Sequence, residues 1–183
     1  MQHYGAPTRL LDFTESPFVA LYFAMEALDP TQLTSHPDAA MAIFALDYSK
    51  MMDASIGCIA KNDIEFRETR LSVYSKQDEV FDNIVDRFSY KIAWVTEPKH
   101  INKRVDLQSG CFVVCGDRDS RIEDILSLPI YEDIGLTKFI IPISLYGNLF
   151  ALLRKMNINS KSLYGDLQGL CRSIRMKMQI YAS

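Results

Sequence analysis

A short apolar run with a clear starting signal is the feature that most constrains how this chain can fold. Ser16 and Pro17 precede ten residues, 18–27, of which Glu26 alone is charged. Serine is a preferred residue just before a helix, and proline is favoured at the first helical position. A helix that is apolar on almost every side is stable where protein covers it. The sequence therefore predicts one fully buried helix at about residues 17–28.

Composition places the chain among ordinary globular proteins. Of its 183 residues, 48% are hydrophobic and 23% are charged, which excludes wholesale disorder. A chain of this length can bury a core without metals or disulfides, so we expect a single domain over residues 1–183. The cysteines form no C-x-x-C pair and are expected to be reduced thiols; they are Cys58, Cys111, Cys115 and Cys171.

Charge and hydropathy limit the partners that we expect. A formal net charge of -3 argues against a general nucleic-acid coat, although a local basic patch around His100 leaves nucleic acid open. The longest largely apolar runs, 18–25 and 139–145, are far shorter than the roughly 18 residues of a membrane span. No charged segment leads into an apolar stretch at the N-terminus. We expect no membrane segment and a cytoplasmic location.

Hydrophobic periodicity predicts an α+β fold with a small, mixed, mostly antiparallel sheet packed with helices. Short apolar runs predict strands at 9–13, 41–46, 93–95, 110–114 and 139–145. The last of these carries Pro142, which favours an edge or a bulge. Helical patterns occur at 77–88, 121–126, 149–156 and 162–178. Because strands and helices intersperse without regular βαβ spacing, α+β is the better class.

Polar and ionisable residues crowd the segment just before the apolar helix. The side chains with donors, acceptors or charge are His3, Thr8, Arg9, Asp12, Thr14 and Glu15. Free N–H groups at a helix start favour anions, so one hypothesis is a pocket for an anionic ligand such as a phosphate. The other is structural: Arg9 pairs with Asp12, while Thr14 and Ser16 cap the helix. The residues by themselves leave both hypotheses open.

This segment also resembles the signature of the FRG domain family, which is named after an N-terminal Phe-Arg-Gly. The matching residues, 3–24, read HYGxPTRLLDxTxSPxVALYFA. Weaker similarity continues at 41–47, in the Q-x-G-x-F pattern of residues 108–112, and at 140–142. Only Met1 and Gln2 precede the segment, so we expect this single FRG-like domain to lack the Phe-Arg-Gly element.

The resemblance implies a distant similarity to ADP-ribosyltransferases and NAD as a candidate substrate. In that reading the candidate catalytic residues are Arg9, Thr14 and Gln108. The candidate ligand-binding residues are His3, Tyr4, Gly5, Thr8, Asp12, Ser16, Tyr22 and Phe23. An aromatic side chain would stack on nicotinamide and Arg9 would hold phosphate. Gln108 can hydrogen-bond a ribose hydroxyl, but it is neutral and stabilises developing positive charge less than a glutamate would.

Three functions follow as hypotheses. The first is an NAD-binding, ADP-ribosyltransferase-like bacterial enzyme of toxin or phage-defence type, acting on a protein target. The alternative is a non-catalytic module that senses a dinucleotide ligand or a partner in a mobile-element or defence system. The third, ranked last, is metal-dependent nucleic-acid cleavage by Asp12, Glu15 and Asp47. If the first strand of the family fold is absent, an exposed sheet edge favours a homodimer.

Overall fold

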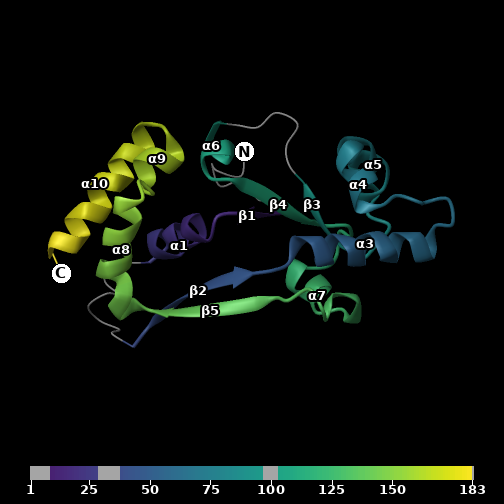
Figure 1. The fold of residues 1–183 in the computed structure, drawn as a ribbon, viewed down its shortest axis with the longest axis horizontal. Helices are drawn as coiled ribbons and strands as arrows, with labels where there is room; N and C mark the ends of the chain where they lie inside the picture. Colours follow the sequence, from purple (N-terminus) through teal and green to yellow (C-terminus); the bar gives the residue numbers. More distant parts are fainter. Residues whose placement is uncertain (1–8, 29–37, 97–102, 183) are drawn as a thin grey trace. The chain divides into compact units, whose positions relative to one another are not determined.

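The fold is a mixed α+β arrangement, as expected from the sequence. The structure is a computed structural model that describes residues 9–28, 38–96 and 103–182 (Figure 1). The chain divides into two compact units. The first unit comprises residues 1–13, 46–99 and 111–136, and the second comprises 14–45, 100–110 and 137–183. Each unit is therefore assembled from separate stretches of sequence.

The first unit combines a three-stranded sheet with several short helices and one long helix. The strand order is β1 (Leu10–Thr14), β4 (Gly110–Cys115), β3 (Ala93–Thr96). Strands β3 and β4 are antiparallel, with Trp94 opposite Val114. The helical elements are α3 (Tyr48–Asn62), α4 (Arg70–Ser75), α5 (Gln77–Asn83), η2 (Val85–Arg87), α7 (Ile122–Leu126) and η3 (Pro129–Tyr131). Trp94 lies fully buried in the core of this unit.

Helix α3 is the principal element that the sequence patterns missed. Asp47 caps it, because its Oδ1 accepts a hydrogen bond from Lys50 N at 3.1 Å. The helix buries five side chains at the i, i+1, i+4, i+5, i+8 spacing of an amphipathic helix: Met51, Met52, Ser55, Ile56 and Ile59. One of these is a serine, and a polar residue in the buried stripe weakens the apolar signal.

The second unit packs helices against a two-stranded sheet. Strands β2 (Ala40–Ala45) and β5 (Thr137–Pro142) are antiparallel, with Ile43 opposite Phe139. The helical elements are α1 (Pro17–Glu26), α6 (Lys103–Leu107), η4 (Ile143–Leu145), α8 (Tyr146–Lys155), α9 (Ser160–Tyr164) and α10 (Leu167–Ala182). Its core includes Tyr22, Met25, Met41 and Leu153. The small sheet expected from the sequence is thus two sheets.

Helix α1 begins where the sequence predicts. Ser16 Oγ accepts a hydrogen bond from Val19 N at 3.4 Å, and Pro17 is the first helical residue. Val19, Leu21, Tyr22 and Met25 are buried. The expectation of burial on every side is wrong at Phe18, which is 41% exposed, because an apolar sequence does not reveal which side its neighbours cover. The helix ends at Glu26, two residues earlier than expected.

Each predicted strand is present, but one ends earlier than expected and two predicted helices are broken. The strand expected to run to residue 145 ends at Pro142, and the 3-10 turn η4 follows. The helix expected over 77–88 ends at Asn83, before Phe88 adopts a left-handed conformation. The final helix is split into α9 and α10 at Gly165, whose φ of 65° favours glycine. Among the described residues, no helix is both long and apolar enough to cross a membrane.

Candidate functional site

Arg9, a predicted catalytic residue, lies in the first unit and is engaged there. Its guanidinium forms an ion pair with Asp86 and lies 3.9 Å from the centre of the Phe88 ring. Arg118 lies over the same ring at 4.3 Å. The structural pairing of Arg9 that the sequence suggested is therefore made with Asp86 and not with Asp12, which is exposed on β1.

The other two predicted catalytic residues, Thr14 and Gln108, meet in the second unit. Thr14 Oγ1 donates to the backbone oxygen of Gln108 at 2.7 Å and accepts from Ser16 N at 3.1 Å. The buried Gln108 side chain donates from Nε2 to Leu163 O at 3.2 Å. Both side chains thus hold the entry to α1 and the turn before β4. A catalytic role for either residue stays a prediction.

The remaining predicted ligand residues fall into three groups. His3, Tyr4, Gly5 and Thr8 lie outside the described residues. Ser16 caps α1, as the structural hypothesis expected. Tyr22 and Phe23 belong to a group of aromatic and charged side chains in the second unit.

That group is centred on Glu26, and Phe23 packs beside its hydrogen-bonded members. We call those members the Glu26 cluster: Tyr22, Glu26, Tyr164 and Arg172. Tyr22 OH donates to Glu26 Oε1 at 2.9 Å, and Tyr164 OH donates to Glu26 Oε2. Arg172 Nη1 lies 2.9 Å from Tyr164 OH and 3.2 Å from Glu26 Oε2. Phe23 contacts both tyrosine rings edge-on, at 5.7 and 6.5 Å between ring centres. The cluster ties α1 to α9 and α10.

Burial keeps the two phenols of the cluster protonated. Burial raises the pKa of Tyr22 far above its usual value; the neighbouring Ser160 hydroxyl lowers it somewhat, and Glu26 raises it further. Burial, followed by the hydrogen bond to Glu26, likewise raises the pKa of Tyr164. Phenols are neutral at physiological pH, and the raised pKa values keep Tyr22 and Tyr164 neutral donors to Glu26 above the ordinary value of 10.0 as well.

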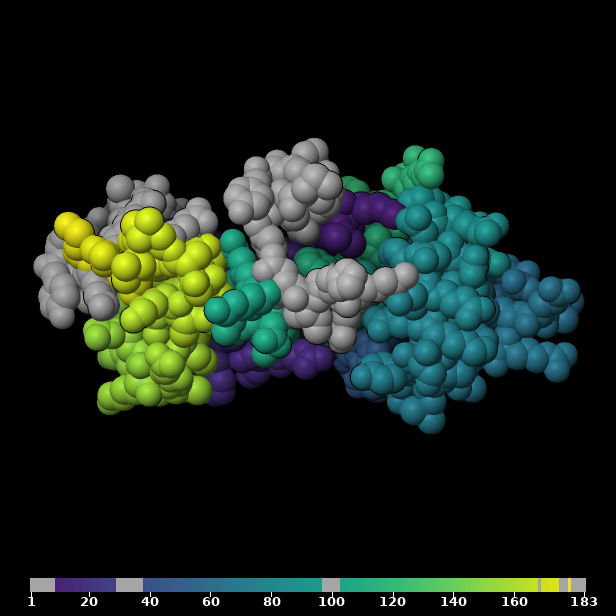
Figure 2. Space-filling model, turned by 90° about the horizontal axis from the view of Figure 1, so that it is seen from above, coloured from purple at the N-terminus to yellow at the C-terminus, as the bar shows by residue number. Residues whose placement is uncertain are grey.

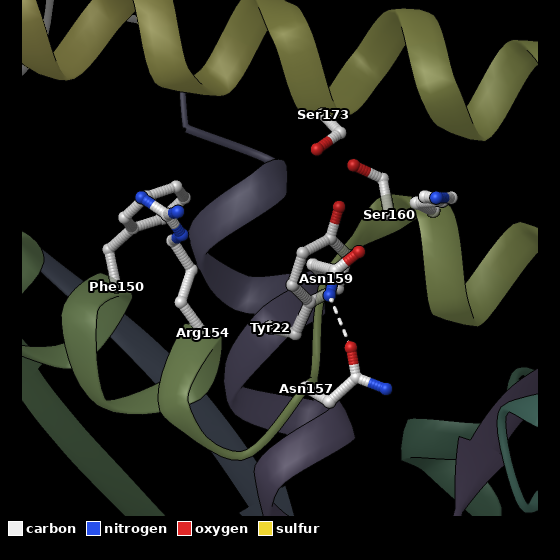
Figure 3. A pocket seen from close by; sticks show the side chains of 8 residues that line it. Tyr22, Phe150, Arg154, Asn157, Asn159, Ser160 and Ser173 are labelled. Atoms are coloured by element: carbon white, nitrogen blue, oxygen red, sulfur yellow. Dashed lines mark hydrogen bonds between the residues drawn. The ribbon is translucent and has the colours of Figure 1, made fainter.

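A pocket of about 270 Å³ opens beside this cluster, with Tyr22 in its wall (Figure 3). The lining residues come from α1, α8, α9, α10 and the turn between α8 and α9: Tyr22, Phe150, Arg154, Asn157, Asn159, Ser160, Lys161 and Ser173. Helices α8 to α10, light green to yellow, lie at the surface on the face drawn in Figure 2. Tyr22 is the one lining residue that the sequence had marked as a ligand candidate.

The turn between α8 and α9 fixes several lining groups. Asn157 adopts a left-handed conformation with φ of 59°. Asn159 Nδ2 donates to Asn157 Oδ1 at 3.2 Å, while Asn159 Oδ1 caps α9 by accepting from Ser162 N at 3.2 Å. Asparagine favours both positions, so the Asn-x-Asn-Ser pattern signals a turn and a cap. It does not signal a pocket, because the other walls come from distant segments.

The lining combines two cations with neutral polar and aromatic groups. Arg154 and Lys161 are the charged residues among the described lining, which includes no carboxylate, histidine or cysteine. Histidine and carboxylates, the side chains that most often act as general base, are thus not among these residues. Elsewhere in the described ranges, no three His, Cys, Asp or Glu side chains gather as a candidate metal site. Asp12, Glu15 and Asp47 gain no support as a metal-binding set.

Comparison with known proteins adds one finding to this α+β fold. Residues 1–32 match the sequence model of the FRG domain. The match confirms the resemblance to the FRG domain family that residues 3–24 carry. It covers all of α1, including Tyr22 and Glu26. No curated protein and no solved structure matches the chain.

Proposed function

We propose that this chain is a non-catalytic, FRG-type ligand-binding module whose ligand occupies the pocket beside α1. The observation that carries the proposal is the position of Tyr22, which belongs both to the FRG-matching segment and to the pocket wall. Small-molecule sites combine aromatic walls with convergent polar side chains. Here Tyr22 and Phe150 are aromatic, and the other described lining residues are polar or charged.

The hydrogen bonds of the predicted catalytic residues favour binding over turnover. The side chains of Thr14 and Gln108 each donate a hydrogen bond to a backbone oxygen, and Arg9 is paired with Asp86. Neutral Gln108 would also stabilise an oxocarbenium-like centre poorly. A protein target, a homodimer and a bacterial defence role stay predictions drawn from the resemblance.

Calorimetric titration with NAD, ADP-ribose and AMP tests this proposal when NAD consumption is followed in the same samples. We expect at least one compound to bind without NAD being consumed. Ser173→Trp should abolish binding by filling the pocket. Ser144→Trp, at an exposed position of the same unit outside the lining, should leave binding intact. Absence of binding by all three compounds would overturn the proposal.

The second candidate function is an NAD-binding, ADP-ribosyltransferase-like activity of toxin or phage-defence type. The observation in its favour is that Thr14 and Gln108, from distant parts of the sequence, lie side by side. Incubation with labelled NAD and candidate target proteins tests it. Transfer of label that Gln108→Ala abolishes would favour this candidate over the non-catalytic module. If the protein neither binds NAD nor transfers label, this candidate function is excluded.

A further inference from the structure

Resting on the proposed function, we propose that the pocket beside α1 is an anion site that takes the phosphate of a small phosphate monoester. The pocket joins two cations from different elements, Arg154 of α8 and Lys161 of α9. Neither forms an ion pair with a carboxylate in the part of the chain that the structure describes. The described lining residues include no acidic side chain, and the neighbouring Glu26 is already paired with Arg172, so the charge of these residues favours an anion.

Exposed cations alone are common on protein surfaces, and a second observation points to a ligand. Ser160 lines the pocket and is 1% exposed, yet its Oγ makes no hydrogen bond of ordinary geometry within the described residues. It does interact with the Tyr22 hydroxyl through a poorly aligned hydrogen bond, which lowers the pKa of Tyr22. A buried hydroxyl without a well-formed hydrogen bond is unusual in native proteins. A ligand oxygen accepting from Ser160 would satisfy it.

The side chains around Ser160 favour an oxygen-rich group. In Figure 3 the hydroxyls of Tyr22, Ser160 and Ser173 point toward the same part of the pocket. Tyr22 already donates its proton to Glu26, so Ser160 and Ser173 are the hydroxyl donors that this part of the pocket offers to an anion. Phosphate oxygens accept such hydrogen bonds while arginine and lysine balance the charge.

The volume and the aromatic wall indicate a small ester. A volume of about 270 Å³ lies just below the roughly 300–1,000 Å³ range typical of ligand pockets. Phe150 gives the pocket an apolar side. Its ring is stacked on that of Tyr146, with 6.4 Å between the ring centres. A phosphate with one sugar or ring suits this space better than a whole dinucleotide.

Titrating the full chain with AMP, adenosine and inorganic phosphate tests the inference. We expect AMP to bind at least about tenfold more tightly than adenosine, and more weakly as salt is raised. Arg154→Gln, Lys161→Gln and Ser160→Ala should each weaken AMP binding about tenfold with an unchanged circular dichroism spectrum. Lys155→Gln, beside Arg154 but outside the lining, should leave the affinity unchanged. Binding of inorganic phosphate as tight as that of AMP would make free phosphate the ligand.

The outcomes separate this inference from the proposed function. Equal affinity for AMP and adenosine, with Ser173→Trp blocking both, would overturn the anion site and leave the binding module intact. If ADP-ribose binds and Arg154→Gln does not weaken that binding, the anion site is likewise overturned and the binding module stands. No binding of any probe would overturn both proposals.

Discussion

Glu26 is the residue on which the second unit converges. It accepts hydrogen bonds from two phenols 142 positions apart in the sequence, Tyr22 and Tyr164, and pairs with Arg172. Its side chain is 15% exposed, so its charge is largely removed from water. Hydrogen bonds to charged groups contribute about 1.5–3 kcal/mol each, roughly twice a neutral one. A charged residue in an apolar helix thus acts as a fixed attachment point.

Tyr164→Phe tests this role. We expect the change to lower the free energy of unfolding by about 1.5–3 kcal/mol, because Glu26 and Arg172 both lose the phenol. Urea denaturation measures it. Tyr146→Phe is the matched control, since Tyr146 is buried in the same unit and its hydroxyl has no hydrogen bond recorded within the described part. Equal effects of the two changes would contradict the role assigned to the cluster.

In the first unit, Tyr131 has a comparable position. Its hydroxyl accepts from Ala93 N at 2.8 Å and lies 2.8 Å from Ser55 Oγ, which also contacts Ala93 O at 2.6 Å. Tyr131→Phe leaves the buried N–H of Ala93 without its acceptor, so we expect the free energy of unfolding to fall by about 1–3 kcal/mol. Fluorescence of Trp94, the chain's one tryptophan, reports unfolding of this unit. Tyr74→Phe, at a residue 74% exposed, should have almost no effect.

At the scale of elements, the junction of α9 and α10 depends on a close approach. A Cβ at Gly169 would lie 2.5 Å from Ser160 O and 2.7 Å from Tyr164 Cβ. Gly169→Ala should therefore destabilise the unit by about 1–3 kcal/mol through overpacking. At Gly147 in α8 a Cβ meets nothing within 4 Å, so Gly147→Ala should stabilise by about 0.5–1 kcal/mol. Thermal denaturation that shifts both variants in the same direction would contradict this packing.

Local signals predicted most elements of the fold. Ser16 and Pro17 predicted the start of α1, and Pro142 marks the end of β5. The split at Gly165 was missed because the apolar periodicity continues across it, although its positive φ is a common helix end. Helix α3 was missed because Ser55 occupies a buried position, where Tyr131 and Ala93 satisfy its hydroxyl. That partnership comes from tertiary structure.

The site was less predictable than the elements. The family resemblance marked Tyr22, which does line the pocket, and it brought Thr14 and Gln108 into one hypothesis. Phe150 and Ser173 belong to no sequence motif, and Ser160 belongs to a pattern that indicates a turn and a cap. Their meeting depends on how α8, α9 and α10 pack. Arg9 shows that the ion-pair partner of a residue is not predictable from neighbouring sequence. Its nearest acidic neighbour in sequence is Asp12, but its ion-pair partner, Asp86, is 77 positions away.

At the scale of the whole molecule, alkaline pH should destabilise the protein. Tyr22 and Tyr164 have pKa values raised in the folded state above the ordinary 10.0. Their contribution is fully present below about pH 10 and is lost as pH rises through the folded values, because the unfolded chain releases these protons first. Urea denaturation should give a clearly lower free energy of unfolding near pH 11 than near pH 9 for the wild type. For a Tyr22→Phe, Tyr164→Phe double variant, this difference in free energy should be smaller. Equal differences for the two proteins would contradict this linkage.

The central claim is that the FRG-matching helix α1 and helices α8 to α10 enclose a site for a phosphate-bearing small molecule. Calorimetric titration of AMP into the wild type, Ser173→Trp and Ser144→Trp tests it most directly. We predict saturable binding to the wild type and to Ser144→Trp, and none to Ser173→Trp. Saturable binding that Ser173→Trp leaves unchanged, or no binding to the wild type, would contradict the claim.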